Sequence, residues 1–571
     1  MGSWLLNEGP KWLILVVWLT IDVVIFTLAF IRFDKNPEFE LLRLFTGSAL
    51  AFARASAASL NYQCMLILLP VCRNLISFLR GSCKCCKRNV TRQFDKNLTF
   101  HKCVAYAICF HTVVHVAAHC FNFELFILGH DSPDVNNTAL LSALSSLRDR
   151  TLEDGTKNET FINPIISGTT EGSLELWKFI SGVTGAVITL CLIVMVSSAT
   201  EVIRRSYFEV FWFTHHLFVI FFIGLVLHGI EGIVRSQTNE PVCKEFKKWG
   251  QANCPQPQFG TLGANTWKWV VGPVAIYIIE RLIRIIRNFQ KVTITKVIKR
   301  PSNVIELQMK KEGFRSQPGQ YVFLKCPQIS WLEWHPFTLT SSPDEDHVTV
   351  HIRCAGDWTR ALATACTEGV GDGVQQASKL PSIAIDGPFG TAAEDIFRYQ
   401  VDVMVAAGIG VTPFASVLKH IWYKYCDPSH EMKLRKVYFY WICPDPMAFE
   451  WIQDLLQSLE VQMAEQGKTG FLIYNIYLTR GWDKDQAAHV ALRHEEEHDP
   501  ITGLQQKTYF GRPNWDQVFA SLAQEHTGTS VGVFFCGPKV LSNTLHTMCN
   551  KYSSADPTGA ATRFFYNKEN F

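Results

Sequence analysis

The first half of this chain contains six apolar runs, and they constrain its fold more strongly than any other feature. They lie at about residues 12–31, 47–70, 100–122, 174–199, 207–231 and 267–288. An α-helix needs roughly 20 apolar residues to cross the hydrocarbon core of a bilayer, which is about 30 Å thick. Asp22 and Arg54 interrupt two of the runs, and Arg54 needs a partner inside the membrane. The sequence therefore predicts six membrane-spanning helices.

The charges between these runs predict which side each loop faces. Lysines and arginines gather in residues 80–96, in residues 200–206 and directly after the last run, and these segments share one side in a six-span arrangement. Because basic loops stay on the cytosolic side, both termini are predicted to be cytosolic. The long loops at about residues 123–173 and 232–266 are then external.

Sequons and cysteines agree with this placement. Asn136 and Asn158 lie in Asn-x-Thr patterns of an external loop and are candidates for glycosylation. The same pattern at Asn89 and Asn97 is predicted to face the cytosol and to stay unmodified. The last external loop contains Cys243 and Cys254. This pair can either form a disulfide or remain two free thiols.

Two of the apolar runs carry paired histidines. His101 and His115 are 14 residues apart in the third run, and His215 and His228 are 13 apart in the fifth. At about 1.5 Å per residue, each pair spans roughly 20 Å. Both runs cross in the same direction, so His101 and His215 share one depth and His115 and His228 the other. Because imidazole is a common ligand of haem iron, and two imidazoles leave no open position, the four predict two electron-transferring haems.

Helical phase adds a condition to this prediction. Fourteen residues at about 100° each return nearly to the same helix face, whereas thirteen miss it by roughly 140°. We therefore expect a break or bulge in the fifth run, near Gly224. The alternative for any single histidine is a hydrogen-bonded packing residue, and three further histidines on these runs allow it, namely His111, His119 and His216.

Other polar residues of the first half leave more than one interpretation open. Arg54 can meet a haem propionate or a small anion such as superoxide, or be neutralised by a polar neighbour or by backbone carbonyls. The basic inner loop contains three cysteines, Cys83, Cys85 and Cys86. They can bind zinc or accept a lipid, although plain free thiols are the favoured interpretation. A net charge of +3 gives no reason to invoke nucleic acid, and the 18 scattered cysteines exclude a disulfide scaffold.

The second half of the chain has two different patterns. From about residue 290, short alternating runs such as VTITKVI and HVTVHIR predict a small antiparallel β-barrel. From about residue 400, apolar strands such as VDVMVAAG and VGVFFCGP alternate with helical stretches, which predicts a parallel sheet with crossover helices. We therefore expect three domains, at 1–289, 290–395 and 396–571.

Three motifs of the predicted barrel suit a flavin, which needs hydrogen-bond donors at its ring and a flat apolar wall. The run HPFTLTS offers hydroxyl donors and a proline-fixed backbone, with candidates at His335, Pro336, Phe337, Thr338 and Ser341. In HIRCAGDWT, an arginine can pair with pyrophosphate, and the candidates there are Arg353, Trp358 and Thr359. DGPFGT forms a tight, donor-rich turn through Gly387, Gly390 and Thr391.

The α/β region carries a nucleotide pattern. A buried strand runs into a glycine turn and then a helix, and glycines there let the backbone and helix N-terminus approach a pyrophosphate. The candidates in this turn are Gly408, Gly410, Thr412 and Pro413. The strand ending FFCGP places Cys536 and Gly537 where a nicotinamide meets the flavin. Arg512 can hold a 2′-phosphate or form a surface salt bridge, and Phe571 can stack on the flavin or pack in the core.

The spaced histidines, HPFTLTS, GIGVTPF, FFCGP and the terminal NKENF together resemble the catalytic subunits of phagocyte-type NADPH oxidases, almost from end to end. Within that family, VSSATE and KYSSADP are most similar to the non-phagocytic vertebrate isoform 1 branch. The resemblance implies a six-helix, haem-binding transmembrane bundle. It also implies a cytosolic module like ferredoxin-NADP reductase, with an antiparallel FAD barrel and a Rossmann-like α/β domain for NADPH.

The same resemblance implies an activity and partners. Electrons would pass from cytosolic NADPH through FAD and two b-type haems to O₂ outside, forming superoxide, with Arg54 and His119 lining the oxygen site. Implied partners are a small transmembrane subunit, cytosolic organiser and activator proteins, and a Rac-type small GTPase. The implied location is the plasma membrane, or endosomal membranes.

One departure from the family pattern bears on the nucleotide. Pro444 follows Cys443 where the family usually has an arginine, which removes a candidate phosphate contact, and the extra Arg480 is a possible replacement. Two other functions compete. A transmembrane ferric or metal reductase would share the whole electron path, whereas a proton channel built on the histidine-rich third run would leave the nucleotide motifs unused.

Overall fold

A computed structural model describes residues 4, 7–82, 92–130, 174, 176–230, 234–239, 243, 248, 251–255, 257–367, 380–426, 432–444, 450–467, 470–479, 498–499, 502–553 and 561–569. The chain forms two compact units. The helical unit comprises Leu15–Cys72 and Asn97–Ile279, and the sheet unit comprises Met1–Ile14, Arg73–Lys96 and Glu280–Phe571. Two short stretches of the first hundred residues therefore pack with the C-terminal half of the chain.

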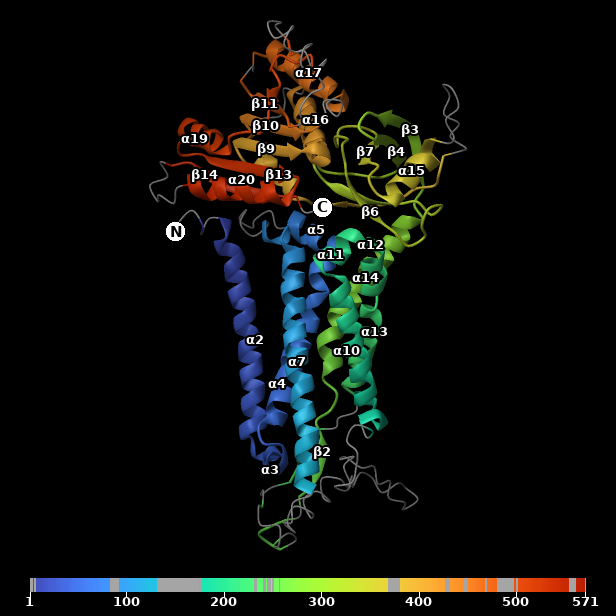
Figure 1. Ribbon diagram of the computed structural model, residues 1–571, viewed down its shortest axis with the longest axis vertical. Helices are drawn as coiled ribbons and strands as arrows, with labels where there is room; N and C mark the ends of the chain where they lie inside the picture. Colours follow the sequence, from blue (N-terminus) through green and yellow to red (C-terminus); the bar gives the residue numbers. More distant parts are fainter. Residues whose placement is uncertain are drawn as a thin grey trace. The chain divides into compact units, whose positions relative to one another are not determined.

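Helices form at all six predicted apolar runs (Figure 1). They are α2 (Gly9–Lys35), α4 (Ala49–Ile67), α7 (Asn97–His130), α10 (Ile180–Ser198), the pair α12 (Phe208–His215) and α13 (Phe218–His228), and α14 (Thr266–Asn288). Two shorter helices are α3 (Glu40–Thr46) and α11 (Glu201–Ser206). Within the helical unit, α4 packs along α7, and α10 packs along α13.

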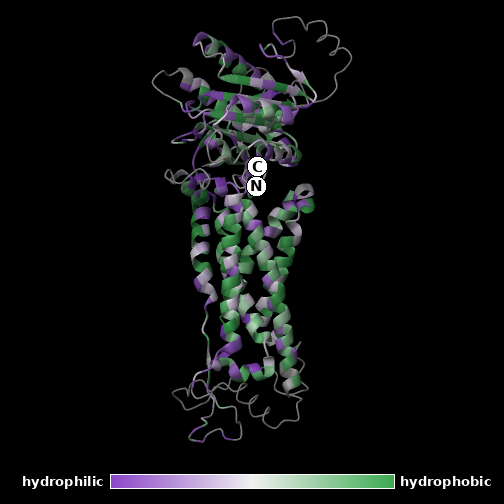
Figure 2. Cartoon of the chain, turned by 90° about the vertical axis from the view of Figure 1, so that its left-hand side faces the viewer, coloured by the Kyte–Doolittle hydropathy of each residue, from purple (hydrophilic) through white to green (hydrophobic). Residues whose placement is uncertain are grey.

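Among the described residues, four helical stretches are long and apolar enough to cross a membrane: Gly9–Lys35, Asn97–Leu125, Ile180–Ser198 and Phe208–His228. A fifth span results if Ala49–Val71 is counted with Arg73–Gly81, from which it is bent by 72°. The sixth predicted run is the helix α14, whose last turns carry Glu280, Arg281, Arg284 and Arg287. The spanning helices expose large apolar side chains and are mostly hydrophobic in colour in Figure 2, as lipid-facing helices require.

The fifth run is broken as its histidine spacing predicts, but at a different place. The break lies at His216 and Leu217, not near Gly224. Three backbone bonds there have the i→i−3 pattern, from the N–H groups of His216, Leu217 and Val219. A 3₁₀ turn advances about 120° per residue, so three such steps reduce the phase mismatch from roughly 140° to roughly 80°.

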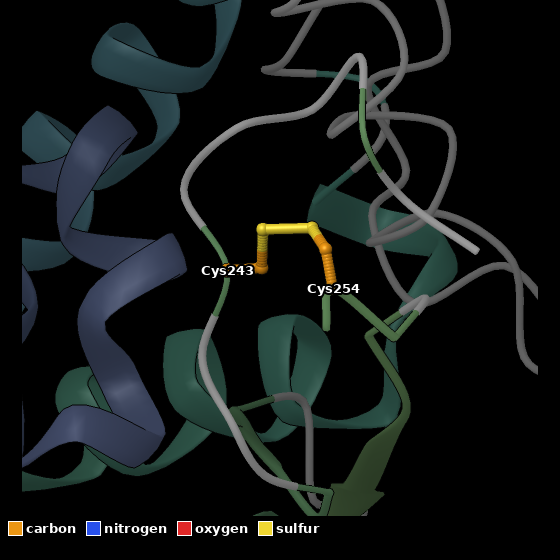
Figure 3. The surroundings of a disulfide bond; sticks show 2 residues. All are labelled: Cys243 and Cys254. Carbon is orange, nitrogen blue, oxygen red and sulfur yellow. A yellow bond between two sulfur atoms is a disulfide. The ribbon is translucent and has the colours of Figure 1, made fainter. Parts of the chain in front are cut away.

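A disulfide joins Cys243 to Cys254 between α13 and α14, which confirms the first of the two interpretations of this pair (Figure 3). A short antiparallel ladder of β1 (Arg235–Gln237) and β2 (Phe259–Thr261) lies in the same connection. The sequons at Asn89, Asn136 and Asn158 lie outside the described residues, as do the inner-loop cysteines, Cys83, Cys85 and Cys86.

The first part of the sheet unit is the predicted antiparallel barrel. One sheet has the order β3 (Val292–Arg300), β4 (Val304–Lys311), β7 (Val348–Arg353), and the other β6 (His335–Thr338), β5 (Tyr321–Lys325), β8 (Ala384–Phe389). A bridge between Leu339 and Val350 links them. Both sheets bury alternating apolar side chains, such as Leu307, Val322 and Ile385, in one core, against which α15 (Asp357–Thr367) packs.

The second part is a six-stranded, entirely parallel sheet in the order β12-β11-β10-β9-β13-β14. Figure 1 labels all of these strands except β12. Its strands are β9 (Val401–Ala407), β10 (Lys436–Cys443), β11 (Leu472–Leu478), β12 (Tyr509–Phe510), β13 (Ser530–Cys536) and β14 (Arg563–Lys568). Helices α16 (Thr412–Cys426) and α17 (Glu450–Glu465) contribute to the core on one face, and α19 (Trp515–Glu525) and α20 (Lys539–Tyr552) to that on the other. The central strands are apolar throughout because both faces are covered.

Candidate functional site

The structure places the four spaced histidines in two facing pairs. The ring centroids of His101 and His215 are 6.3 Å apart, and those of His115 and His228 are 6.2 Å apart. A metal bound about 2 Å from one nitrogen of each of two opposed imidazoles holds the ring centroids roughly 6 Å apart. The geometry of both pairs therefore fits one haem iron each, and haem ligation by these histidines stays a prediction.

The other ring nitrogens of these histidines are held by neighbouring groups. Nδ1 of His101 lies 2.9 Å from the carbonyl oxygen of Ile67, and Nδ1 of His115 lies 2.9 Å from that of Ala53. Nδ1 of His228 is 3.2 Å from the hydroxyl of Thr184. Metal-binding histidines usually donate their second ring N–H to such an acceptor, which leaves Nε2 for the metal. For His215, no described residue offers Nδ1 a hydrogen bond.

Two of the additional histidines have packing roles. Nε2 of His111 lies 2.8 Å from the buried carboxylate of Asp22, which also accepts a 2.9 Å bond from the Gln63 amide. Gln63 in turn accepts a bond from Trp18. His216 bonds the carbonyl of Trp212 at the break between α12 and α13. A membrane carboxylate needs partners of this kind, so Asp22 explains the position of His111.

Arg54 and His119 lie near the His115–His228 pair. The ring of His119 is 4.6 Å from that of His115, centroid to centroid, and Arg54 is close enough to interact electrostatically with both. The Arg54 guanidinium stacks 5.2 Å from the ring of Phe33, and among the described residues its Nε has no hydrogen-bond partner and its side chain no ion pair. A polar side chain that neutralises Arg54 is therefore not found among the described residues, and an anion as its partner stays a prediction.

In the barrel, HPFTLTS forms β6 and a wall of stacked rings. His335 stacks on Trp358 at 4.1 Å and Phe337 lies 6.0 Å from the same indole. Pro336 is exposed on the same strand, and Thr338 is buried. Nε1 of Trp358 is buried without a partner among the described residues. A flat aromatic wall with an unused donor fits a flavin.

Two of the predicted flavin residues also form hydrogen bonds within the protein. The Ser341 hydroxyl accepts a hydrogen bond from the Thr349 N–H, and the Thr359 hydroxyl bonds Gly356 at the start of α15. These bonds help to hold the barrel and the first turn of α15, and a contact of either residue with the flavin stays a prediction. Arg353, in contrast, ends β7 with an exposed side chain. It stands a few residues before the N-terminus of α15, where the free N–H groups of a helix favour a phosphate.

The glycine motif lies at the topological switch point of the parallel sheet. From β9 the chain runs outward to β10, β11 and β12 and then returns to β13 on the other side of β9. Gly408 follows β9 with φ +56, and a Cβ on Gly410 would lie 2.4 Å from the carbonyl oxygen of Cys536, at the end of β13. Likewise, a Cβ on Gly537 would lie 2.8 Å from the Cβ of Ala407. Ligands of open α/β sheets bind at this crevice.

Other predicted nucleotide residues share this carboxyl edge. Thr412 and Pro413 form the buried first turn of α16, and Arg512 is exposed just after β12. Pro444, which departs from the family pattern, is exposed directly after β10. Burial raises the pKa of the Cys536 thiol, so this thiol is neutral and not activated as a nucleophile. Arg480 and Phe571 lie outside the described residues.

Sequence reasoning missed a buried charge cluster beside this edge. Arg80 donates to the Thr391 carbonyl at 2.6 Å and to Asp395 at 3.1 Å, and its Nε lies 3.6 Å from Asp95 and 3.7 Å from Glu394. Glu569 accepts a 2.7 Å bond from the N–H of Ala393. Its own N–H bonds the carbonyl of Phe535 at 2.9 Å, so Glu569 links the end of β14 to β13 and to the 3₁₀ turn Ala392–Arg398 that follows DGPFGT. The only sequence signal for Glu569 was its position within the NKENF motif.

Glu569 predicts a pH dependence of stability. Burial raises the pKa of its carboxyl to about 8, and burial likewise raises the pKa of Asp95 to about 7. The native state therefore holds protons that the unfolded chain has released between about pH 4.5 and 8, so stability falls as the pH rises through this window. Glu569→Gln keeps a neutral acceptor for Ala393. Between pH 5 and 9, we expect the melting temperature of Glu569→Gln to decline less than that of the parent. Equal declines of the melting temperature with pH in the two proteins would contradict a protonated Glu569.

Three family models match the chain. Residues 61–226 match "Ferric reductase like transmembrane component", residues 289–393 match "FAD-binding domain" and residues 399–550 match "Ferric reductase NAD binding domain".

Full-length relatives are also found. The chain is 51% identical over 580 residues to NADPH oxidase 3 of Homo sapiens, covering 100% of both chains, and 48% identical over 581 residues to NADPH oxidase 1 of Mus musculus, covering 100% of this chain and 95% of that one. It is 39% identical over 582 residues to a superoxide-generating NADPH oxidase heavy chain of Dictyostelium discoideum, covering 99% and 97%. Among solved structures, a ferredoxin NADP⁺ reductase from Neisseria gonorrhoeae covers 49% of this chain and 97% of its own length, at 15% identity and a TM-score of 0.31.

Proposed function

This chain belongs to the NADPH oxidase family, and on that premise we propose that its sheet unit takes electrons from NADPH and its helical unit delivers them to O₂ across a membrane. It is a superoxide-forming oxidoreductase that uses NADPH, FAD and haem. When bound, the flavin accepts a two-electron hydride and the haems pass single electrons. The observation that carries the proposed path is the pair of facing histidine couples, 6.3 and 6.2 Å apart.

In the helical unit, we propose that His101 and His215 hold the haem nearer the cytosol and that His115 and His228 hold the outer one. Backbone carbonyls orient the rings of His101 and His115. Arg54 supplies a buried positive charge next to His119, which attracts an anion where superoxide forms. Arg54 and His119 would act on O₂ or superoxide without forming a covalent bond to it.

In the sheet unit, the proposed flavin residues are those of β6 and the start of α15. His335, Phe337 and Trp358 form the aromatic wall, and Arg353 pairs with the pyrophosphate. The proposed NADPH residues surround the switch point: Gly408, Gly410, Thr412, Pro413, Arg512, Cys536 and Gly537. Cys536 and Gly537 close the crevice where nicotinamide would meet the flavin. Phe571, which lies outside the described residues, is proposed to stack on the flavin.

The partners and location follow the family resemblance. We propose a small transmembrane partner subunit, cytosolic organiser and activator proteins, and a Rac-type small GTPase. We also propose the plasma membrane or endosomal membranes, with both termini in the cytosol. The basic segments next to the spans and the disulfide-linked Cys243 and Cys254 in the predicted external loop support this orientation.

Ferric reduction is the second candidate, because two of the matching family models carry the name ferric reductase. The experiment that separates the two activities uses the reconstituted chain with NADPH and FAD. Cytochrome c reduction that superoxide dismutase suppresses, with no reduction of an external ferric chelate under anaerobic conditions, supports oxygen as acceptor. Rapid anaerobic reduction of the chelate would favour the reductase.

Arg512 is predicted to select NADPH over NADH. Its exposed guanidinium stands at the carboxyl edge, and a charge-assisted fork to a 2′-phosphate contributes about 1.5–3 kcal/mol. Arg512→Ala should therefore raise the KM for NADPH by roughly 10- to 100-fold and leave kcat and the KM for NADH nearly unchanged. Steady-state kinetics with both nucleotides measures this. A parallel loss with NADH would mean that Arg512 acts on the fold and not on the phosphate.

A further inference from the structure

The end of α14 has two different faces. Glu280 accepts bonds from Asn74 and the N–H of Leu75, whereas Arg284 and Arg287 both pair with the buried carboxylate of Asp386. These charged residues follow the spacing of one helix face, and they bind other segments of the sheet unit to which this helix end itself belongs. The opposite face carries Leu282, Ile286 and Phe289, which are 51%, 64% and 80% exposed. An apolar stripe of this kind, at the end of the helix formed by the sixth predicted run, is suited to lipid.

A loop of the flavin barrel stands beside this helix end. It connects β5 to β6 and occupies residues 326–334. Lys325, at its base, donates to Asn288 at 3.2 Å and lies 5.5 Å from the ring of Trp331 and 5.7 Å from that of Trp334. Arg284 also lies over Trp334, at 5.7 Å. The loop is therefore fixed to the last turn of α14.

The tip of this loop is apolar and open. Trp331 is 75% exposed and Leu332 is 63% exposed, whereas the base is held by bonds from the N–H groups of Ile329 and Ser330 to the Cys326 carbonyl. We call the three exposed residues Phe289, Trp331 and Leu332 the aromatic tip. A structured loop gains nothing in water by presenting these side chains, so an exposed apolar group of this kind indicates a binding surface.

We propose that the aromatic tip inserts into the headgroup region of the cytosolic leaflet and anchors the flavin barrel to the membrane surface. Phe289 continues the exposed apolar stripe of α14, and the arginines of the same turns are typical of the cytosolic end of a membrane span. Tryptophan prefers this interface, and the exposed Lys291 next to the tip suits the anionic lipids of the cytosolic leaflet.

The anchor has a consequence for the flavin site. Trp331 and Leu332 precede His335 by only a few residues, and β6 follows directly. Fixing the tip in the leaflet fixes the start of the strand that carries the proposed flavin wall. The occupant is the bilayer surface, and this inference does not depend on which acceptor the chain reduces.

Photo-crosslinking tests the contact without any turnover. The photoreactive residue p-benzoylphenylalanine is placed at Trp331 in the full chain, reconstituted in nanodiscs of equal parts phosphatidylcholine and phosphatidylserine. The matched control is the same residue at Val540, which is 80% exposed on α20. We expect at least tenfold more lipid adduct from position 331, measured by mass spectrometry. Equal yields at the two positions, or adducts with a second copy of the chain in place of lipid, would overturn the proposal.

A second measurement tests the consequence. In Trp331→Ser/Leu332→Ser, NADPH-driven haem reduction in the same nanodiscs should slow several-fold, whereas NADPH-driven reduction of a soluble dye should match the parent. Val540→Ser should alter neither rate. The haem spectrum reports whether each variant is folded. Haem reduction at the parental rate in the folded double variant would show that the tip does not anchor the barrel.

Discussion

His115→Leu is expected to remove one of two haems and to lower superoxide output by at least about 100-fold. In the structure, the His115 ring is fixed by the Ala53 carbonyl and faces His228 at 6.2 Å. Leucine fills a similar volume but offers no nitrogen to iron. The haem-to-chain ratio, measured by the pyridine haemochrome spectrum, should fall from two to one, and superoxide dismutase-sensitive cytochrome c reduction reports the output.

The matched control for this prediction is His216→Leu. His216 lies at the break between α12 and α13, next to His215, but its ring is exposed and among the described residues hydrogen-bonds only the Trp212 carbonyl. We expect this variant to keep two haems and most of its activity. Two haems in His115→Leu, or one haem in both variants, would contradict the assignment of the outer pair.

The fifth run shows how far a sequence pattern determines such a site. Spacing alone indicated both the pairing of the histidines and the need for a break, because depth and helical phase depend only on residue counts. It misplaced the break at Gly224, whose Cβ would lie 2.5 Å from Ile188, so that glycine allows close packing of two helices. The break instead follows Thr214, whose hydroxyl bonds the Val210 carbonyl and the Ser198 hydroxyl. Side-chain bonds of this kind bend helices, and they depend on a neighbour that sequence does not place.

The sheet unit was predicted well for a related reason. Its strand and glycine motifs are local, so Gly408, Cys536 and the β-barrel runs indicate their own surroundings. Arg80 and Glu569 gave no such signal. Arg80 contacts Asp395, more than 300 positions away in the chain, at 3.1 Å. A basic inner loop is ordinarily explained by membrane orientation, so nothing in the sequence separated the buried Arg80 from arginines that face water.

Arg80→Ala is expected to destabilise the sheet unit severely. The Arg80 side chain is only 3% exposed and lies against Asp95, Glu394 and Asp395. Removing one partner of a buried ion pair leaves uncompensated charge and costs about 3–5 kcal/mol. Arg80 also bonds the Thr391 carbonyl in the DGPFGT turn, so FAD retention should fall together with stability.

Arg398→Ala is the control, and pH separates charge from packing. Arg398 also binds Asp395, at 3.0 Å, but its side chain is 40% exposed, so its removal should cost less than about 1 kcal/mol. Burial raises the pKa of Asp95 and of Glu394, and without Arg80 both carboxyls would titrate still higher. Their protonated forms persist at acid pH and are lost as the pH rises, so the deficit of Arg80→Ala should widen from pH 6 to pH 9. Melting curves and bound FAD across this range measure it. A deficit that is independent of pH would show that Arg80 contributes packing and not charge.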